Sequence, residues 1–273
     1  MKIGLALSGG GVRGIAHLGI IKALEERGFS FAHVSGASAG SIIGAFYCSG
    51  YKPEEILKIL EKTSLYKIVR PAISWRGLLK LDKVINEFKS YFENDSFESL
   101  KIPLHISATD ITHGTIKYFY EGSLMKAMLA SSSIPVVFDP VKIDDTYYID
   151  GGILNNLPVE PVKETCDMVV GIHTNSAGIH EGPINMKMLM ERSLLLAIKC
   201  NVDMRKDMCD LFIEPEGLGK YGVFDIKKAR EIFELGYRFV NKLLDEDREK
   251  AAKHIEERYL KSYNKVRNNM RNG

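Results

Sequence analysis

The sequence predicts an α/β fold in three layers (α/β/α) with a mostly parallel central sheet. Apolar segments of strand length alternate with segments whose apolar residues recur at helical spacing, a pattern typical of such domains. The run from Met168 to His173 is continuously apolar, as in strands that are buried on both faces. With 273 residues, 45% of them hydrophobic and 26% charged, the chain is long enough for one domain with a large core.

The first part of the chain predicts two strand–turn–helix units and a further helix. A glycine-rich loop from Gly9 to Gly14 follows the first strand, and Gly28 and Gly50 end the two helices. The third helix begins at Pro53, which is favoured in a first helical turn. The predicted elements are strands over 2–8 and 31–35 and helices over 15–27, 38–49 and from 53 onward.

The segment from Leu65 to Tyr91 has two interpretations. It contains an apolar cluster close to arginines and lysines, formed by Trp75, Leu78, Leu79 and Leu81. The segment is either a loop and helix packed on the core or a cap over a functional site.

The second part of the chain predicts five more strands and three more helices. The strands cover 104–108, 115–120, 147–149, 168–173 and 211–214, and the helices cover 124–131, 186–200 and 225–244. After Asp245 the sequence reads as a charged helix that carries only positive charges beyond Arg258. We therefore expect a main domain over 1–244 and a charged helical appendage over 245–273, which is either solvated or in contact with an anionic membrane surface.

Composition excludes several classes of function. The net charge of +2 is too small to indicate nucleic-acid binding. No window reaches the roughly 18 apolar residues of a membrane span, and no signal peptide is recognisable. We therefore expect a cytoplasmic location. Because the four cysteines lack metal-ligand spacing, we expect reduced thiols and no metal.

The loop Gly9-Gly10-Gly11-Val12-Arg13-Gly14 satisfies the G-x-G-x-x-G pattern of dinucleotide sites. Such a site also needs an acidic residue roughly 20 residues further on to bind the ribose. No Asp or Glu occurs between Arg27 and Pro53, and the lysine–serine or lysine–threonine pair of a P-loop is absent. The sequence therefore argues against a nucleotide.

Gly36-Ala37-Ser38-Ala39-Gly40 has the G-x-S-x-G pattern of a nucleophilic serine on a sharp strand-to-helix turn. Neighbouring parallel strands end side by side, so the Gly9 loop is expected beside Ser38. Its N–H groups, chiefly those of Gly10 and Gly11, would then form an oxyanion hole. Arg13 either braces this loop or meets an anionic head group.

Asp150 is the strongest candidate for the base, because Asp150-Gly151-Gly152 directly follows a predicted strand. Three histidines follow it, at His173, His180 and His254, but none has the surroundings expected of a catalytic residue.

These motifs, in this order, resemble those of the patatin-like phospholipases. The similarity includes 130–135 and 156–159 and extends over most of residues 3 to 240. The resemblance implies a catalytic domain over 1–244 with Ser38 as nucleophile, Asp150 as base and an oxyanion hole at Gly9, Gly10 and Gly11. It further implies acyl-ester hydrolysis on phospholipids without a metal or other cofactor. Arg13, Gly14, Gly36, Gly40, Gly151 and Gly152 are the supporting residues of the three motifs.

Two alternatives remain open at this point. The same dyad would serve a soluble carboxylesterase or thioesterase, and the fold would serve a lipid-binding module without activity. If the substrate is a membrane lipid, we expect peripheral contact with the inner membrane face. The candidate contacts are the Trp75 cluster, the stretch from Met186 to Leu196, whose methionines could equally be core, and the basic end from Arg258 to Arg271.

Overall fold

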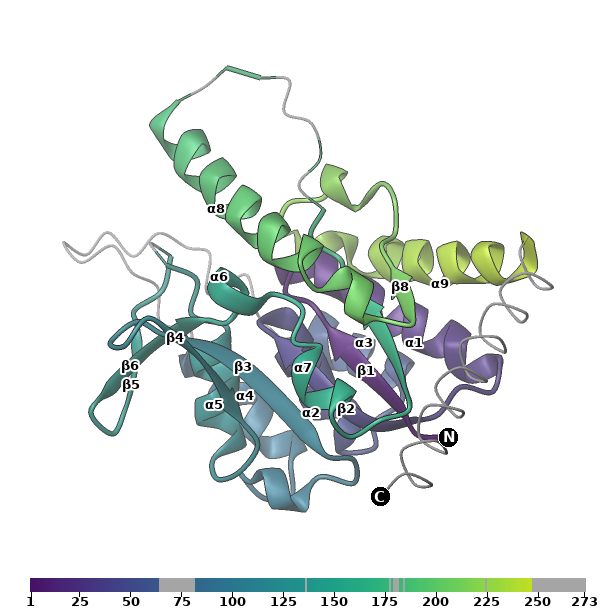
Figure 1. Cartoon of the computed structure of the whole chain (residues 1–273), viewed down its shortest axis with the longest axis horizontal. Helices are drawn as coiled ribbons and strands as arrows, with labels where there is room; N and C mark the ends of the chain where they lie inside the picture. The colour runs from purple at the N-terminus through teal and green to yellow at the C-terminus, as the bar shows by residue number, and fades with distance from the viewer. Residues whose placement is uncertain are drawn as a thin grey trace, which may run out of the picture.

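The chain is described by a computed structural model that covers residues 1–63, 82–135, 137–176, 178, 182–183, 185–223 and 225–246. Within these residues, a single eight-stranded sheet forms the centre of the fold (Figure 1). Its strands are β1 (Ile3–Leu7), β2 (Phe31–Ala37), β3 (Leu104–Asp110), β4 (Thr115–Phe119), β5 (Val141–Ile143), β6 (Thr146–Asp150), β7 (Met168–Ile172) and β8 (Leu211–Ile213).

The strands are arranged in the order β5-β6-β3-β2-β1-β7-β8, and β4 also pairs with β3. The five strands from β3 to β8 in this order run parallel, whereas β4, β5 and β6 make antiparallel pairs. The predicted α/β fold with a mostly parallel sheet is therefore confirmed, with an antiparallel extension on one side.

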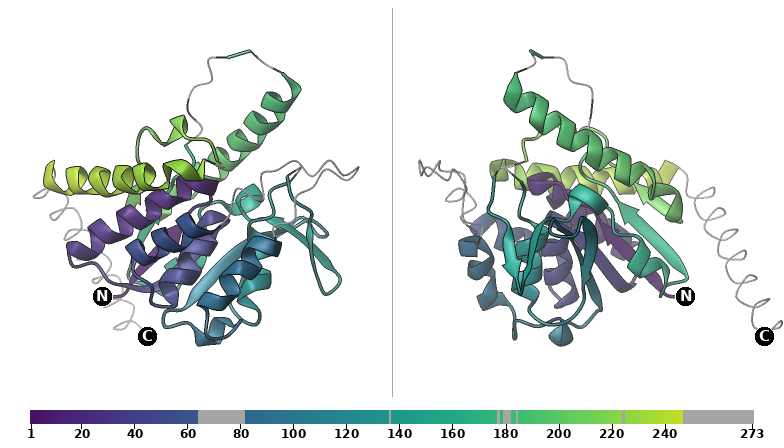
Figure 2. Two further views of the ribbon diagram at one scale, coloured as in Figure 1. Left: turned by 180° about the vertical axis from the view of Figure 1, so that it is seen from behind. Right: turned by 60° about the vertical axis from the view of Figure 1, so that its left-hand side comes forward.

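Helices cover both faces of the sheet, as Figures 1 and 2 show. They are α1 (Ala16–Glu26), α2 (Ala39–Cys48), α3 (Pro53–Lys62), α4 (Asp82–Phe88), α5 (Leu124–Ser131), α6 (Gly152–Asn155), α7 (Glu160–Lys163), α8 (Met186–Asp203) and α9 (Ala229–Glu246). A short 3-10 helix, Gly11–Ile15, precedes α1, so the chain becomes helical earlier than the predicted start at residue 15.

Strand β1 shows why the two faces carry different layers. Leu5 and Leu7 belong to the large core that also contains the side chains of α1 and α9, whereas Ala6 belongs to a smaller core beside α7. Gly4 is needed on that second face, because a Cβ there would lie 2.8 Å from Cβ of Val162. The large side chains of β1 thus face the layer that contains α1 and α9, and its small residues allow α7 to approach the opposite face closely.

Two predicted segments fall partly outside the described residues. Of the segment 65–91, the part that is described packs on the core, since Phe88 is buried edge-on against Phe46 with ring centroids 5.2 Å apart. The Trp75 cluster lies outside the described residues. Most of the predicted appendage over 245–273 also lies outside the described residues. Its first two residues belong to α9, which continues without a break to Glu246.

Candidate active site

Ser38 lies on the turn between β2 and α2, in a backbone conformation that is rare for a residue with a side chain. Its φ is 51° and its ψ −120°. The flanking glycines allow this turn by close approach: a Cβ on Gly36 would lie 2.4 Å from Gly40 O, and one on Gly40 would lie 2.3 Å from Leu7 O. Such strain at a serine is typical of a functional position.

Asp150 is the last residue of β6 and lies beside Ser38, because β6 and β2 pair with consecutive parts of the same side of β3. Ser107 of β3 pairs with Ala37 of β2, and the next residue, Ala108, pairs with Asp150 of β6, while β4 pairs with both Ser107 and Ala108 from the other side of β3. Ser38 Oγ donates a hydrogen bond of 2.6 Å to Asp150 Oδ2. The structure thus brings together the two residues that the sequence singled out as nucleophile and base.

The two glycines after Asp150 hold its carboxylate in place. Gly152 N–H donates to Asp150 Oδ1 at 2.8 Å. Gly151 lies against β3, where a Cβ would come within 2.2 Å of Ser107 O. Neither position has room for a side chain, because a Cβ on Gly152 would lie 2.6 Å from Asn156 Oδ1.

Burial makes the Asp150 carboxylate a better proton acceptor than an exposed one. The side chain is almost completely buried, and this burial raises its pKa to about 6, against the opposing effect of the hydrogen bonds from Ser38 and Gly152. A buried carboxylate loses hydration that would stabilise its charge, so it holds a proton more tightly. At neutral pH the group is still mostly ionised and available as a base.

The glycine loop lies against Ser38, but its three glycines have different roles. A Cβ on Gly9 would lie 3.0 Å from Ser38 Cβ. Gly9 N–H donates to both the backbone and the side-chain oxygen of Asn156, at 3.2 and 3.1 Å. The N–H groups of Gly10 and Gly11 have no hydrogen-bond acceptor within the described residues. These two N–H groups can therefore donate to a ligand without giving up a protein hydrogen bond, whereas Gly9 N–H cannot.

Gly11 and Gly14 are required by the path of the loop. Gly11 has a φ of +57°, and a Cβ there would lie 2.4 Å from Val223 O. A Cβ on Gly14 would lie 2.7 Å from Cβ of Ala39, the residue after the predicted nucleophile. The loop and the Ser38 turn can therefore pack together only if Gly14 has no side chain.

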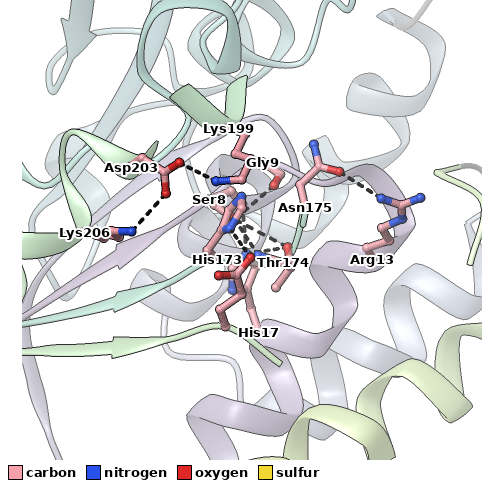
Figure 3. A network of polar contacts seen from close by, with 11 residues as sticks. Ser8, Gly9, Arg13, His17, His173, Thr174, Asn175, Lys199, Asp203 and Lys206 are labelled. Carbon is pink, nitrogen blue, oxygen red and sulfur yellow. Dashed lines mark hydrogen bonds and ion pairs between the residues drawn. The ribbon is translucent and has the colours of Figure 1, made fainter. Parts of the chain in front are cut away.

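Arg13 braces the glycine loop against two other segments. Its guanidinium donates to Tyr221 O at 2.8 Å, Asn175 Oδ1 at 3.1 Å and Gly219 O at 3.5 Å. Figure 3 shows the contact with Asn175. Of the two interpretations of Arg13, the structure favours the brace.

Three polar residues of the site were not assigned a role from the sequence. Ser131 Oγ accepts a hydrogen bond of 2.8 Å from Ser38 N–H. Asn201 in α8 accepts a hydrogen bond of 2.9 Å from Asn156 N–H and donates one of 3.0 Å to Gly152 O. It therefore connects Asn156, which binds the glycine loop, to the turn that follows Asp150. Ser131 and Asn156 lie in the stretches 130–135 and 156–159, whose resemblance to the family could have pointed to a role. No sequence pattern pointed to Asn201.

In the described part of the chain, no hydrogen bond of the Ser38 or Asp150 side chain involves a histidine. His173 is buried directly after β7, and its Nδ1 is 3.1 Å from Glu214 Oε1. His180 and His254 lie outside the described residues. The same part of the chain contains no group of three or more His, Cys, Asp and Glu residues that could hold a metal ion.

The sequence is similar to several known proteins. A family model described as patatin-like phospholipase matches residues 5–163, more than half of the chain. An NTE family protein of Mycobacterium tuberculosis is 34% identical over 185 residues, which are 67% of this chain and 51% of that protein. Lysophospholipase NTE1 of Cryptococcus neoformans is 30% identical over 176 residues, 60% of this chain and 10% of that protein. The chain thus spans about half the length of the mycobacterial relative.

Among solved structures, VipD from Legionella pneumophila has a similar fold. The TM-score is 0.58 at 17% sequence identity, and the match covers 90% of this chain and 67% of VipD. At this identity the similarity concerns the fold alone.

Proposed function

The chain belongs to the patatin-like phospholipase family, and on this premise we propose that it is a serine lipid acyl hydrolase of the phospholipase A or lysophospholipase type. The observation that carries the proposal is the hydrogen bond of 2.6 Å from Ser38 Oγ to the buried Asp150 carboxylate. A relative with the printed name lysophospholipase supports the substrate class.

The proposed reaction has two halves that use the same dyad. Asp150 Oδ2 accepts the proton of Ser38 Oγ while this oxygen attacks the acyl carbonyl. The tetrahedral intermediate collapses, the carbonyl–oxygen bond to the alcohol breaks, and the alcohol leaves with the proton. Water then gives its proton to Asp150 and attacks the acyl-serine, which releases the fatty acid and restores the proton to Ser38.

The N–H groups of Gly10 and Gly11 would stabilise the negative oxygen of each tetrahedral intermediate. Both are without a protein acceptor in the described residues, and the loop contacts the Ser38 side chain through Gly9. A carboxylate with a pKa of about 6 is a weak base for a hydroxyl group. The mechanism therefore depends strongly on this oxyanion hole, where one donor is typically worth roughly 10²–10³ in rate.

The pH dependence of hydrolysis tests the role of Asp150. Below its pKa the carboxyl carries a proton and cannot accept another, so kcat/KM should fall as the pH is lowered, with an apparent pKa of about 6. The measurement is kcat/KM for a soluble acyl ester across the stable pH range. A profile whose midpoint lies near ~4, the value of an exposed aspartate, would contradict the assignment.

The alternative enzymes differ from this proposal only in the substrate. A soluble carboxylesterase or thioesterase would use the same dyad and loop, whereas a lipid-binding module without activity would hydrolyse neither class. Comparing hydrolysis of phospholipid vesicles, soluble esters and acyl thioesters separates the three. Preference for vesicles supports the lipid acyl hydrolase.

We also propose that α8 contacts the membrane surface. Its apolar side chains Met186, Leu189, Met190 and Leu196 are 71%, 48%, 49% and 48% exposed. This contradicts the alternative that Met186 and Met190 are core residues. The C-terminal half of α8 is held at the site by Asn201, whereas its N-terminal half extends beyond the neighbouring elements in Figure 2. Such a surface suits insertion into the headgroup region, and methionines adapt to varied acyl chains.

Among the described residues, no helix is both long and apolar enough to cross a membrane. Vesicle binding tests the proposed contact of α8. The double variant Leu189→Glu and Met190→Glu should bind phospholipid vesicles at least about tenfold more weakly in co-sedimentation. Two apolar side chains partly buried in the membrane surface would contribute about 2 kcal/mol to the binding free energy. Met204→Glu is the matched control, since Met204 is also exposed, at 66%, but lies directly after the other end of α8. Unchanged vesicle binding by the double variant would contradict the proposal.

A further inference from the structure

We infer that Ser8 is a positioning residue that fixes the direction in which the Gly10 N–H group points. The inference rests on the proposed function, since it takes Gly10 N–H as an oxyanion donor. Ser8 directly follows β1 and is completely buried. Figure 3 shows it between the glycine loop and the segment after β7.

The Ser8 hydroxyl connects these two segments through a defined pair of hydrogen bonds. Its Oγ accepts from Thr174 N–H at 2.9 Å and donates to Gly9 O at 3.0 Å. A hydroxyl has one proton to donate. The other oxygen within reach, Thr174 Oγ1, is farther away at 3.5 Å, so the geometry assigns that proton to Gly9 O.

This bond matters because Gly9 C=O and Gly10 N–H belong to one peptide unit. The unit is planar and trans, so its C=O and N–H point in opposite directions. A hydrogen bond that anchors Gly9 O therefore also fixes the direction of Gly10 N–H. Gly10 N–H is left without a protein acceptor among the described residues, as an oxyanion donor should be before substrate binds.

The neighbouring peptide units of the loop are anchored in the same way. Gly9 N–H is held by Asn156, and the carbonyl of the same unit, Ser8 O, lies 2.8 Å from His17 Nε2. In the next unit, Gly10 O accepts from Arg13 N–H at 3.2 Å. Of these three peptide units, the one that carries Gly10 N–H is anchored by the Ser8 side chain, at the end of β1.

Removing the Ser8 hydroxyl should affect the transition state more than the bound substrate. Gly9 O would lose its anchor, and the peptide unit would be free to tilt its N–H away from the reacting oxygen. The oxygen acquires full negative charge only in the tetrahedral intermediate, so the loss appears there. We expect Ser8→Ala to lower kcat by about 10–100-fold and to change KM less than about twofold.

Binding of inhibitors separates positioning from a general structural effect. A trifluoromethyl ketone adds to the nucleophilic serine and places a negative oxygen in the oxyanion hole, whereas a fatty-acid product does not form this adduct. Ser8→Ala should weaken the ketone in proportion to the loss in kcat and leave the affinity for the fatty acid unchanged. Ser8→Cys keeps a weaker hydrogen-bond donor, so its kcat and its ketone affinity should lie between those of the wild type and of Ser8→Ala.

Ser35→Ala is the matched control. Ser35 is also completely buried, lies on the neighbouring strand β2 and donates from its hydroxyl to a backbone carbonyl, that of Pro158, away from the glycine loop. This variant should keep both kcat and ketone affinity near the wild-type values. Thermal unfolding of all variants reports on folding.

The inference is wrong if folded Ser8→Ala or Ser8→Cys keeps the wild-type kcat and ketone affinity. It is also wrong if ketone and fatty acid are weakened equally, or if Ser35→Ala shows the same loss. Failure of the proposed function looks different: wild-type protein would then not form the ketone adduct, and Ser38→Ala would retain the rate.

Discussion

Ser38→Ala should reduce hydrolysis of a chromogenic fatty-acyl ester to the uncatalysed background. The variant has no oxygen to attack the acyl carbonyl, and the described part of the chain places no other hydroxyl in hydrogen-bond contact with the Asp150 carboxylate. The measurement is the initial rate at equal concentrations of folded protein. Ser49→Ala is the control, because Ser49 lies at the other end of α2 and its hydroxyl donates to Ala45 O.

Wild-type activity in Ser38→Ala would overturn the assignment of the nucleophile. A loss in Ser49→Ala of similar size would instead show that α2 does not tolerate substitution.

Asp150→Asn should lower kcat by about 10²–10⁴-fold, the range typical of losing a general base. The amide has nearly the size of the carboxylate, so its oxygen still fits the Gly152 N–H and its nitrogen can face Ser38 Oγ. It cannot accept the proton of Ser38. The rate of ester hydrolysis at saturating substrate is the measurement.

The same substitution should not destabilise the protein at pH 8. The pKa of Asp150 is raised in the folded state, so the folded protein binds the proton more tightly than the unfolded chain between pH 3.8 and about 6. Wild-type stability from this group is full at low pH and is lost as the pH rises through about 6. Asp150→Asn removes the buried charge, and its Tm at pH 8 should equal or exceed that of wild type by a few degrees.

Histidine substitutions provide the contrast for the proposed dyad. Replacing His173, His180 or His254 singly should leave most of the rate, and His173 can be judged structurally, since its Nδ1 hydrogen bonds to Glu214. A loss at one histidine as large as that of Asp150→Asn would indicate a triad in place of a dyad.

The candidate residues Ser38 and Asp150 could be predicted from the sequence because each belongs to a short glycine-containing motif. Glycines on both sides of Ser38 and after Asp150 indicate tight turns, and the structure shows the close backbone approaches that require them. The distance between Ser38 and Asp150 could not be predicted. It depends on β6 pairing with β3 beside β2, and the paired residues of β3 and β6 are roughly 40 positions apart in the sequence.

The finer features of the site also depend on tertiary contacts. Gly9, Gly10 and Gly11 are alike in sequence, and tertiary contacts distinguish them: Gly9 N–H donates to Asn156, and Gly11 lies close to Val223 O. The strand β5 has three residues and α6 and α7 have four each, too few for a period to be recognised. The Met-rich stretch of α8 has the composition of a core helix, and only the structure shows that its N-terminal half is exposed.

Covalent labelling of the wild-type protein tests the central claim most directly. A fluorophosphonate reacts with a serine that an adjacent base activates, and peptide mass spectrometry identifies the residue modified. The account predicts one labelled residue, Ser38, with labelling strongly slowed in Asp150→Asn. Labelling at a different residue, or at Ser38 with an unchanged rate in Asp150→Asn, would contradict it.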